Sequence, residues 1–174
     1  MSATQPAAEY HEEQRFRQRW IWTLLLLMTL GVTALFAHGL YTQLYLGQPW
    51  GDRPMSDSAL LVTAVATIVL TAGASLLFYQ LRLTTIVDCE GIHLRFFPLT
   101  SKHIRFDQIR SCTARTYRPI REYGGWGIRF SRKGNAYNVS GNRGVQLELH
   151  NARPLLIGSQ RADQLAAAIN AHRH

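Results

Sequence analysis

Cysteine is scarce in this chain, which has only Cys89 and Cys112 among its 174 residues. No His, Cys or acidic pair has the spacing of a metal site, so no metal ligand set is expected. A phosphate-cradling glycine loop and a nucleophile elbow are also missing. The sequence therefore predicts a protein that is not an enzyme and that carries no cofactor.

Charge is absent from two long stretches, residues 20–40 and 58–81, neither of which contains Asp, Glu, Lys or Arg. A helix over either stretch is roughly 30 Å long, which matches the hydrocarbon core of a bilayer. We therefore expect a transmembrane hairpin, with an N-terminal segment over 1–19, transmembrane helices over 20–40 and 58–81, and a connector over 41–57. The lack of ionisable residues inside the spans argues against a transport path. A secretory signal peptide is the alternative for the first stretch, although that stretch is long and the second follows at once.

Arginine flanks the two stretches on one side of the expected membrane. Arg15, Arg17 and Arg19 precede the first stretch and Arg82 follows the second, whereas the connector holds only Arg53. Because basic residues in short flanks are retained in the cytoplasm, we expect both termini there and the connector outside it. The predicted location is a bacterial inner (plasma) membrane that the chain crosses more than once, and both cysteines are expected as reduced thiols.

Small residues recur every four positions in both stretches. Lipid tails give helices no hydrophobic reason to associate, so close backbone approach and hydroxyl hydrogen bonds must supply the attraction. We therefore expect the two rows of small residues to face each other within the hairpin. The predicted packing residues are Thr29, Thr33, Ala37, Ala59, Thr63, Thr67, Thr71 and Ser75.

After residue 81 the pattern changes to short alternating apolar runs separated by Gly, Pro and Asn, which is typical of β-strands. A first expected strand ends at Val87. Further strands are expected over 92–97, 104–106, 109–117, 126–130, 136–140, 145–149 and 155–157. Ser159 is a candidate cap for a closing helix whose Ala162, Leu165 and Ile169 share one face. Residues 82–174 therefore form one small cytoplasmic domain, and the fold class of the chain is α+β.

The run of strands closed by one amphipathic helix resembles the pleckstrin-homology-like (PH-like) domain of membrane-anchored bacterial proteins of uncharacterised function. The segments that carry the resemblance are residues 88–96, 104–109, 123–129 and 136–141. The resemblance implies a PH-like β-barrel or sandwich with a C-terminal helix, and no general activity. Residues 88–91 form a short acidic turn where phosphoinositide-binding members have a long basic loop, so that binding mode is not expected.

Three glycines beside Trp126 make the most unusual local sequence. Gly124, Gly125 and Gly127 indicate one of two things. They either shape the backbone around a buried tryptophan or let a second chain approach closely.

Basic residues are concentrated in the predicted domain, where residues 82–174 have a net charge of +9 against −1 for the rest of the chain. The candidate contact residues are Arg115, Arg118, Arg121, Tyr123, Trp126, Arg129, Arg132, Lys133 and Arg143. They predict an accessory, scaffold or assembly protein that binds a membrane protein partner.

The basic residues fit two further roles. One is a sensor of anionic phospholipid head groups, and the second is the general basicity that retention favours in cytoplasmic domains. The lipid bilayer is the remaining expected partner. No nucleic acid is expected, because the domain is anchored and no nucleic-acid motif occurs.

Overall fold

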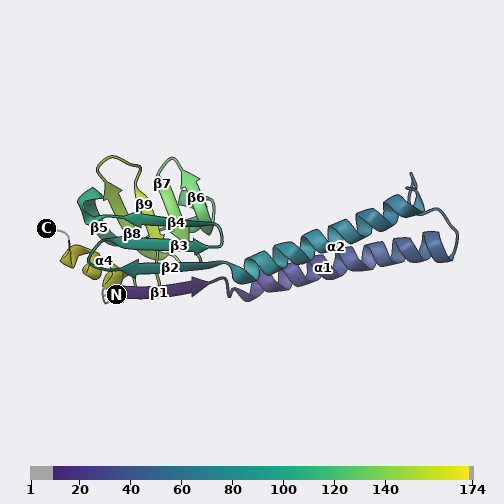
Figure 1. The fold of residues 1–174 in the computed structure, drawn as a ribbon, viewed down its shortest axis with the longest axis horizontal. Coiled ribbons are helices and arrows are strands. Elements are labelled where there is room, and N and C mark those ends of the chain that lie inside the picture. Colours follow the sequence, from purple (N-terminus) through teal and green to yellow (C-terminus); the bar gives the residue numbers. More distant parts are fainter. Residues whose placement is uncertain (1–9, 173–174) are drawn as a thin grey trace, which may run out of the picture. The chain divides into compact units, whose positions relative to one another are not determined.

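The structure, a computed structural model, describes residues 10–172 of the chain. It divides into two compact units. The helical unit covers Arg17–Tyr79, and the β domain combines the described residues up to Phe16 with those from Gln80 onward. Two apolar helices and two β-sheets confirm the predicted α+β class (Figure 1).

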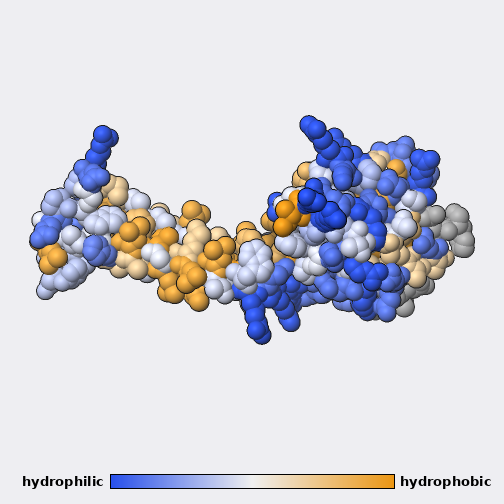
Figure 2. All heavy atoms as spheres, turned by 180° about the vertical axis from the view of Figure 1, so that it is seen from behind, coloured by the Kyte–Doolittle hydropathy of each residue, from blue (hydrophilic) through white to orange (hydrophobic). Residues whose placement is uncertain are grey.

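The helical unit has two long helices, α1 (Arg19–Leu40) and α2 (Asp57–Gln80). Each agrees with its predicted stretch to within one residue at either end. A π-helical segment, η1 (Tyr41–Tyr45), continues α1 into the predicted connector. Both helices are long and apolar enough to cross a membrane. Figure 2 shows their apolar side chains gathered along the middle of the unit, with polar side chains at the connector end.

The two helices run side by side (Figure 1). The Trp22 ring on α1 packs edge-on against the Tyr79 ring on α2, with 6.1 Å between the ring centres. At the connector end the Trp50 ring covers Gly39 so closely that a Cβ on Gly39 would lie 2.8 Å from the ring. The Gln43 amide then donates to the Met55 carbonyl and the Asp57 carboxylate, at 2.8 and 2.7 Å. Side-chain contacts therefore close this end of the hairpin.

The predicted packing residues do not all lie on the covered sides of the helices. Covered or half-buried positions in α1 include residues 22, 25, 29, 32, 36 and 39, together with residues 21 and 40 near its ends. This alternation of three and four residues keeps one straight seam, whereas a strict four-residue row winds around the helix. Thr29, Ala59, Thr67, Thr71 and Ser75 are half-buried, and Thr33, Ala37 and Thr63 are exposed. The half-buried hydroxyls donate to backbone carbonyls of their own helix.

A strand precedes the first helix, which the sequence pattern does not predict. Residues Tyr10–Arg15 form β1, which pairs antiparallel with β2 (Arg82–Val87). The pairing begins with Tyr10 opposite Val87 and ends with Arg15 opposite Arg82. Part of the predicted N-terminal segment 1–19 thus belongs to the β domain, while residues 1–9 lie outside the described residues. The whole helical unit is an insertion between two neighbouring strands.

The first sheet has four strands in the order β1-β2-β3-β4, with β3 at Ile92–Phe97 and β4 at Thr100–Ile104. The expected strand at 104–106 is wrong beyond Ile104, because Phe106–Gln108 forms a 3-10 turn, η2, whose Gln108 N–H donates to the Arg105 carbonyl. Along β2 and β3, inward and outward residues alternate, and Leu83, Leu94 and Phe96 are buried. One face of this sheet therefore faces the core and the other faces outward.

The second sheet has five strands in the order β5-β8-β9-β7-β6. Their bounds are Ile109–Thr116 (β5), Gly127–Ser131 (β6), Gly134–Asn138 (β7), Arg143–Leu149 (β8) and Leu155–Gly158 (β9). Strands β7 and β9 are parallel, and all other pairs are antiparallel. The two sheets stay separate, so the barrel that the resemblance allowed is not observed.

Two helices complete the β domain. Helix α4 (Ala162–Ala171) packs against β5 and β8 of one sheet and against β1 and β2 of the other. Its Ala162, Leu165 and Ile169 are buried, as predicted. Ser159 is not the cap of α4, whose preceding residue is Arg161; its hydroxyl instead accepts the Arg161 N–H. The short α3 (Pro119–Tyr123) lies between β5 and β6 and is not predicted.

A buried carboxylate ties β1 to the end of the chain. Glu12 is only 7% exposed, and its Oε2 accepts hydrogen bonds from the Tyr10 and Ser159 hydroxyls, while its Oε1 accepts the Gln160 N–H at 2.8 Å. Beside it, the Gln14 amide donates to the Gly158 carbonyl. Burial, followed by the hydrogen bond to Glu12, raises the pKa of Tyr10 to about 12. The Tyr10 hydroxyl therefore stays protonated and donates throughout the neutral range.

Removal of this carboxylate tests whether β1 is part of the folded domain. Glu12→Ala leaves two hydroxyls and an N–H without their acceptor, and hydrogen bonds to charged groups are worth about 1.5 to 3 kcal/mol each. We expect a loss of at least about 2 kcal/mol and a fall of roughly 8 °C or more in the unfolding midpoint of the β domain. Thermal unfolding of the full chain in mild detergent, followed by circular dichroism, measures this. The matched control is Glu13→Ala on the opposite face of β1, which should change stability by less than about 0.5 kcal/mol; equal effects would contradict the role of Glu12.

Candidate functional site

The nine predicted contact residues do not form one surface. Three of them, Arg115, Tyr123 and Trp126, hold the segment between β5 and β6 in place. Arg143 is ion-paired to α4, where its Nη2 lies 2.9 Å from both carboxylate oxygens of Asp163. The other five residues, Arg118, Arg121, Arg129, Arg132 and Lys133, are exposed.

Arg115 fixes α3 to the sheet. Its guanidinium donates to Glu122 at 2.9 Å, to the Gln146 side chain at 3.0 and 3.2 Å, and to the Tyr123 hydroxyl at 3.2 Å. Glu122 also accepts the Arg118 N–H at 2.7 Å, which closes the first turn of α3. Partial burial raises the pKa of Glu122, but these hydrogen bonds outweigh it and hold the pKa below its ordinary value. With four hydrogen bonds already made, Arg115 is a structural residue.

Tyr123 belongs to the core and not to a contact surface. It is 4% exposed and packs edge-on against Tyr117 at 6.0 Å, above Ala136 and Leu156 of the five-stranded sheet. The Tyr117 hydroxyl accepts a hydrogen bond from the Asn138 amide at 2.9 Å. Burial raises the pKa of both tyrosines. The crossing from β5 to β6 is thus fastened to that sheet by aromatic rings.

The glycines beside Trp126 shape the backbone. Gly124 ends α3 in the left-handed conformation, with φ 74°, and Gly127 starts β6 with φ 111°. A Cβ at either position would meet nothing within 4 Å, so these glycines serve backbone conformation and not the close packing of a neighbour. The Trp126 indole N–H donates to the Gly141 carbonyl at 2.9 Å, and the ring is half-buried. The structure therefore favours the first of the two interpretations of this segment, with a tryptophan that is only half-buried.

Exposed cations and exposed apolar residues occur together on α3 and at the β6–β7 turn. Ile120 on α3 is 69% exposed and Phe130 on β6 is 73% exposed. Helix α3 packs against β6, and β6 pairs only with β7 among the described strands. We refer to these residues as the β6–α3 surface: Arg118, Ile120, Arg121, Phe130, Arg132 and Lys133.

Sequence reasoning found the cations of this surface but missed its apolar residues. A signal for α3 is present, because Pro119 stands at the first helical position and Gly124 follows the last. That pattern would have placed Ile120 on a short helix. The exposure of Phe130 has no sequence signal, since an alternating strand residue is normally buried.

Chemistry-bearing side chains do not converge at this surface. Within residues 10–172, no three His, Cys, Asp or Glu side chains lie close enough together to hold a metal ion. Cys89 is exposed and Cys112 is buried, and neither forms a disulfide. The β6–α3 surface can offer charge, apolar contact and the backbone of an edge strand.

No protein-family model matches this chain, and no curated protein matches it in sequence.

Substitution of Arg115 separates the structural arginine from its exposed neighbour. Arg115→Ala leaves Glu122 and Gln146 without their donors, and we expect a loss of about 1 to 2 kcal/mol, together with faster amide hydrogen exchange in α3. Arg118→Ala removes a side chain that makes no side-chain hydrogen bond among the described residues and should change stability by less than about 0.5 kcal/mol. Thermal unfolding and hydrogen exchange of the full chain measure both. A neutral Arg115→Ala would mean that the Glu122 contact contributes nothing to the fold.

Proposed function

We propose that this protein is a membrane-anchored accessory protein, a scaffold or assembly factor, whose PH-like β domain binds a membrane protein partner at the β6–α3 surface. The observation that carries the proposal is the joint exposure of Phe130 and Ile120 among four cations beside an unpaired strand edge. The two apolar side chains lie on elements that pack against each other, and an exposed apolar patch with a polar rim is typical of an interaction site.

The helical unit supports membrane anchoring. Both helices are long and apolar enough to span a bilayer. Since β1 and β2 are hydrogen-bonded neighbours, an insertion that crosses the bilayer must cross it an even number of times and return to the same side. The helices are flanked on that side by Arg15, Arg17, Arg19 and Arg82. Basic flanks of this kind favour a cytoplasmic location of the β domain in a bacterium whose inner membrane the chain crosses twice.

The β domain supports the PH-like interpretation in outline. Within residues 10–172, nine strands form two sheets, and a helix after the last strand contacts both of them. The turn between β2 and β3 is tight, because the Asp88 carboxylate accepts the N–H groups of Glu90 and Gly91 at 2.9 and 3.1 Å. An acidic turn of this kind does not offer phosphoinositides a basic loop. The parallel pair β7–β9 is a feature that the resemblance does not account for.

The chemistry of the surface indicates the kind of partner segment. An edge strand presents unpaired N–H and C=O groups that can pair with an added strand. Arg118, Arg121, Arg132 and Lys133 have no ion pair among the described residues, so acidic side chains on the added strand would find free cations. The opposite edge strand, β5, packs against α4. We therefore expect an extended, acidic segment with one or two apolar residues.

Photo-crosslinking in native membranes tests the surface directly. A photoreactive phenylalanine analogue at Phe130 or at Ile120 of the full chain should crosslink to one and the same membrane protein. Arg118→Glu with Arg121→Glu should reduce the yield about tenfold, equivalent to about 1.4 kcal/mol of binding free energy. Quantitative mass spectrometry of the crosslinked product identifies the partner and measures the yield.

The chain provides matched controls for both parts of this experiment. Leu99 is 56% exposed in the turn between β3 and β4 of the other sheet, so the analogue at Leu99 should not capture the same protein. Arg110 and Arg153 are exposed and lie outside the β6–α3 surface, so Arg110→Glu with Arg153→Glu should leave the yield unchanged. Equal capture from Leu99, or equal loss in both charge-reversed pairs, would rule out this surface as the binding site.

Cys89 provides a native reporter of membrane topology. It is exposed on the turn between β2 and β3, whereas Cys112 is buried. A membrane-impermeant maleimide should label Cys89 of the full chain in inverted inner-membrane vesicles and not in intact spheroplasts. Gln48→Cys in a Cys89→Ala background places the reporter in the connector and should give the reverse pattern. Labelling of both positions from the same side would show that α1 and α2 do not cross the membrane between them.

A further inference from the structure

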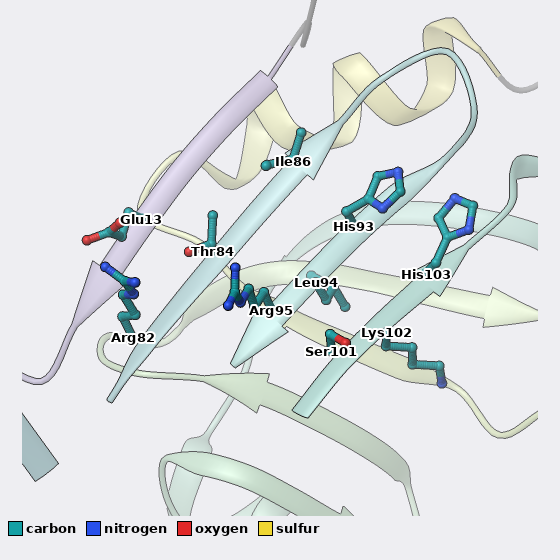
Figure 3. A pocket seen from close by; sticks show the side chains of 10 residues that line it. All are labelled: Glu13, Arg82, Thr84, Ile86, His93, Leu94, Arg95, Ser101, Lys102 and His103. Carbon is teal, nitrogen blue, oxygen red and sulfur yellow. The ribbon is translucent and has the colours of Figure 1, made fainter. Parts of the chain in front are cut away.

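The outer face of the four-stranded sheet has a shallow depression with a different composition from the β6–α3 surface. It has a volume of about 450 Å³, and residues from all four strands line it. Figure 3 shows Arg82 and Arg95 on neighbouring strands, on the same side as Thr84, with the His93 and His103 rings further along β3 and β4. None of these residues is among the contact residues that the sequence predicts.

Two guanidinium groups lie near one aromatic ring in this region. The Arg82 guanidinium carbon lies 4.9 Å from the centre of the Phe97 ring, and that of Arg95 lies 5.3 Å from it. Neither arginine forms an ion pair with a described residue. Two like charges held near the same ring repel each other, so an anion between them would be stabilised by both.

The acidic side chains nearby already have partners. Glu13 on β1 lies 2.7 Å from Arg15, and the Arg15 hydrogen bond lowers the pKa of Glu13. Asp88 lies 3.1 Å from the His93 Nε2, and His93 in turn stacks on His103 at 4.2 Å. Arg15 thus forms the ion pair with Glu13, and Arg82 adds a weaker electrostatic attraction to the same carboxylate. Arg95 has no ion-pair partner among the described residues, so much of the positive charge of the two arginines is still available to an anion.

Hydroxyl groups stand in register with the two arginines. Thr84 pairs with Arg95 across β2 and β3, and Arg95 pairs with Ser101 across β3 and β4. Guanidinium groups and hydroxyls are the side chains that most often bind phosphate oxygens, and arginine does so with two parallel N–H groups. We refer to Arg82, Thr84, Arg95 and Ser101 as the arginine row. This row provides the donor set of a phosphate site.

The position of this row along the chain indicates the source of the phosphate. Arg82 follows the last residue of α2, Gln80, by two positions, and Arg15 precedes the first residue of α1 by four. Phe97 pairs with Arg82 at the same end of the sheet, and the exposed Leu99 follows in the next turn. A row of arginines beside an aromatic ring and an apolar turn, at the chain's entry into two apolar helices, matches the interfacial zone of a bilayer.

We infer that Arg82 and Arg95, with Thr84 and Ser101, bind the phosphate of an anionic phospholipid head group. The inference rests on the membrane anchoring proposed above and is independent of the β6–α3 surface. Its basic residues lie on the faces of β2 and β3 and not in the acidic turn that joins these strands. The bound lipid would fix the outer face of the four-stranded sheet against the bilayer.

Native mass spectrometry of the full chain in mild detergent tests the site. Wild-type protein should retain phosphatidylglycerol about tenfold more than phosphatidylcholine. Arg82→Gln with Arg95→Gln should abolish this preference, whereas Arg82→Lys with Arg95→Lys, which keeps the charge but not the fork of donors, should retain part of it. The matched control, Arg110→Gln with Arg153→Gln, changes exposed arginines outside both surfaces and should bind lipid like the wild type.

Each contrary outcome counts against the inference. Equal retention of the two lipids by the wild type, or an unchanged preference in Arg82→Gln with Arg95→Gln, overturns it. Displacement of phosphatidylglycerol by inorganic phosphate at similar concentration would mean that the site binds free phosphate and not a lipid. If the double variant is not folded, as judged by thermal unfolding, the single variant Arg95→Gln decides, because Arg95 is exposed and its substitution should leave the fold intact. This variant is expected to show a preference for phosphatidylglycerol at least threefold lower than that of the wild type. Release of the wild type from membranes by sodium carbonate would refute the anchoring itself, whereas retention without lipid preference would refute only the lipid site.

Discussion

The fold depends on the pairing of β1 with β2, two strands that the entire helical unit separates in sequence. Six residues of each strand are in register, and the pairing ends with Arg15 opposite Arg82, where the chain leaves for α1 and returns from α2. The entropy of closing a loop grows only slowly with its length, so two paired strands can hold a long insertion at both ends. The helices are therefore connected to the β domain twice, and both connections start from one hydrogen-bonded sheet.

The strand β1 also connects the beginning of the domain to its end, which explains its unusual composition. Its inward residues are Tyr10, Glu12 and Gln14, all of which carry polar groups. Glu12 is buried because it faces the start of α4, where the Gln160 N–H and the Ser159 hydroxyl need an acceptor and a negative charge is favoured. Tyr10 donates to Glu12, and Gln14 donates to the Gly158 carbonyl of β9. Loss of β1 would expose one edge of the first sheet and leave these groups unpaired, so the N-terminal strand and the C-terminal helix stabilise each other.

The sequence is informative where burial follows hydrophobicity and misleading where it does not. The two helices are predicted to within a residue because long uncharged apolar runs have few structural alternatives, and β3 is predicted at both ends because apolar and polar residues alternate up to Pro98. Strand β1 has no such alternation, since its buried positions are polar and its partners are far away in sequence. For the candidate site, the pattern identified the cations, but it could not separate Arg115, which makes four hydrogen bonds, from Arg118, whose guanidinium makes none among the described residues. That difference depends on Glu122, Tyr123 and Gln146, which only the fold brings together.

The net charge of the β domain is therefore not one property with one function. Arg115 and Arg143 are engaged by Glu122 and Asp163, and Arg15 is engaged by Glu13, so these arginines contribute structure and little attraction at a distance. Two groups of cations without ion pairs lie apart from each other: Arg82 and Arg95 on the four-stranded sheet, and the cations of the β6–α3 surface beside the five-stranded sheet. Arg110 and Arg153 belong to neither group. Because the sheets are separate, one group can bind an anionic head group while the other contacts a protein. A division of charge between two faces, and not the total charge, would therefore allow the domain to bind a membrane and a partner at the same time.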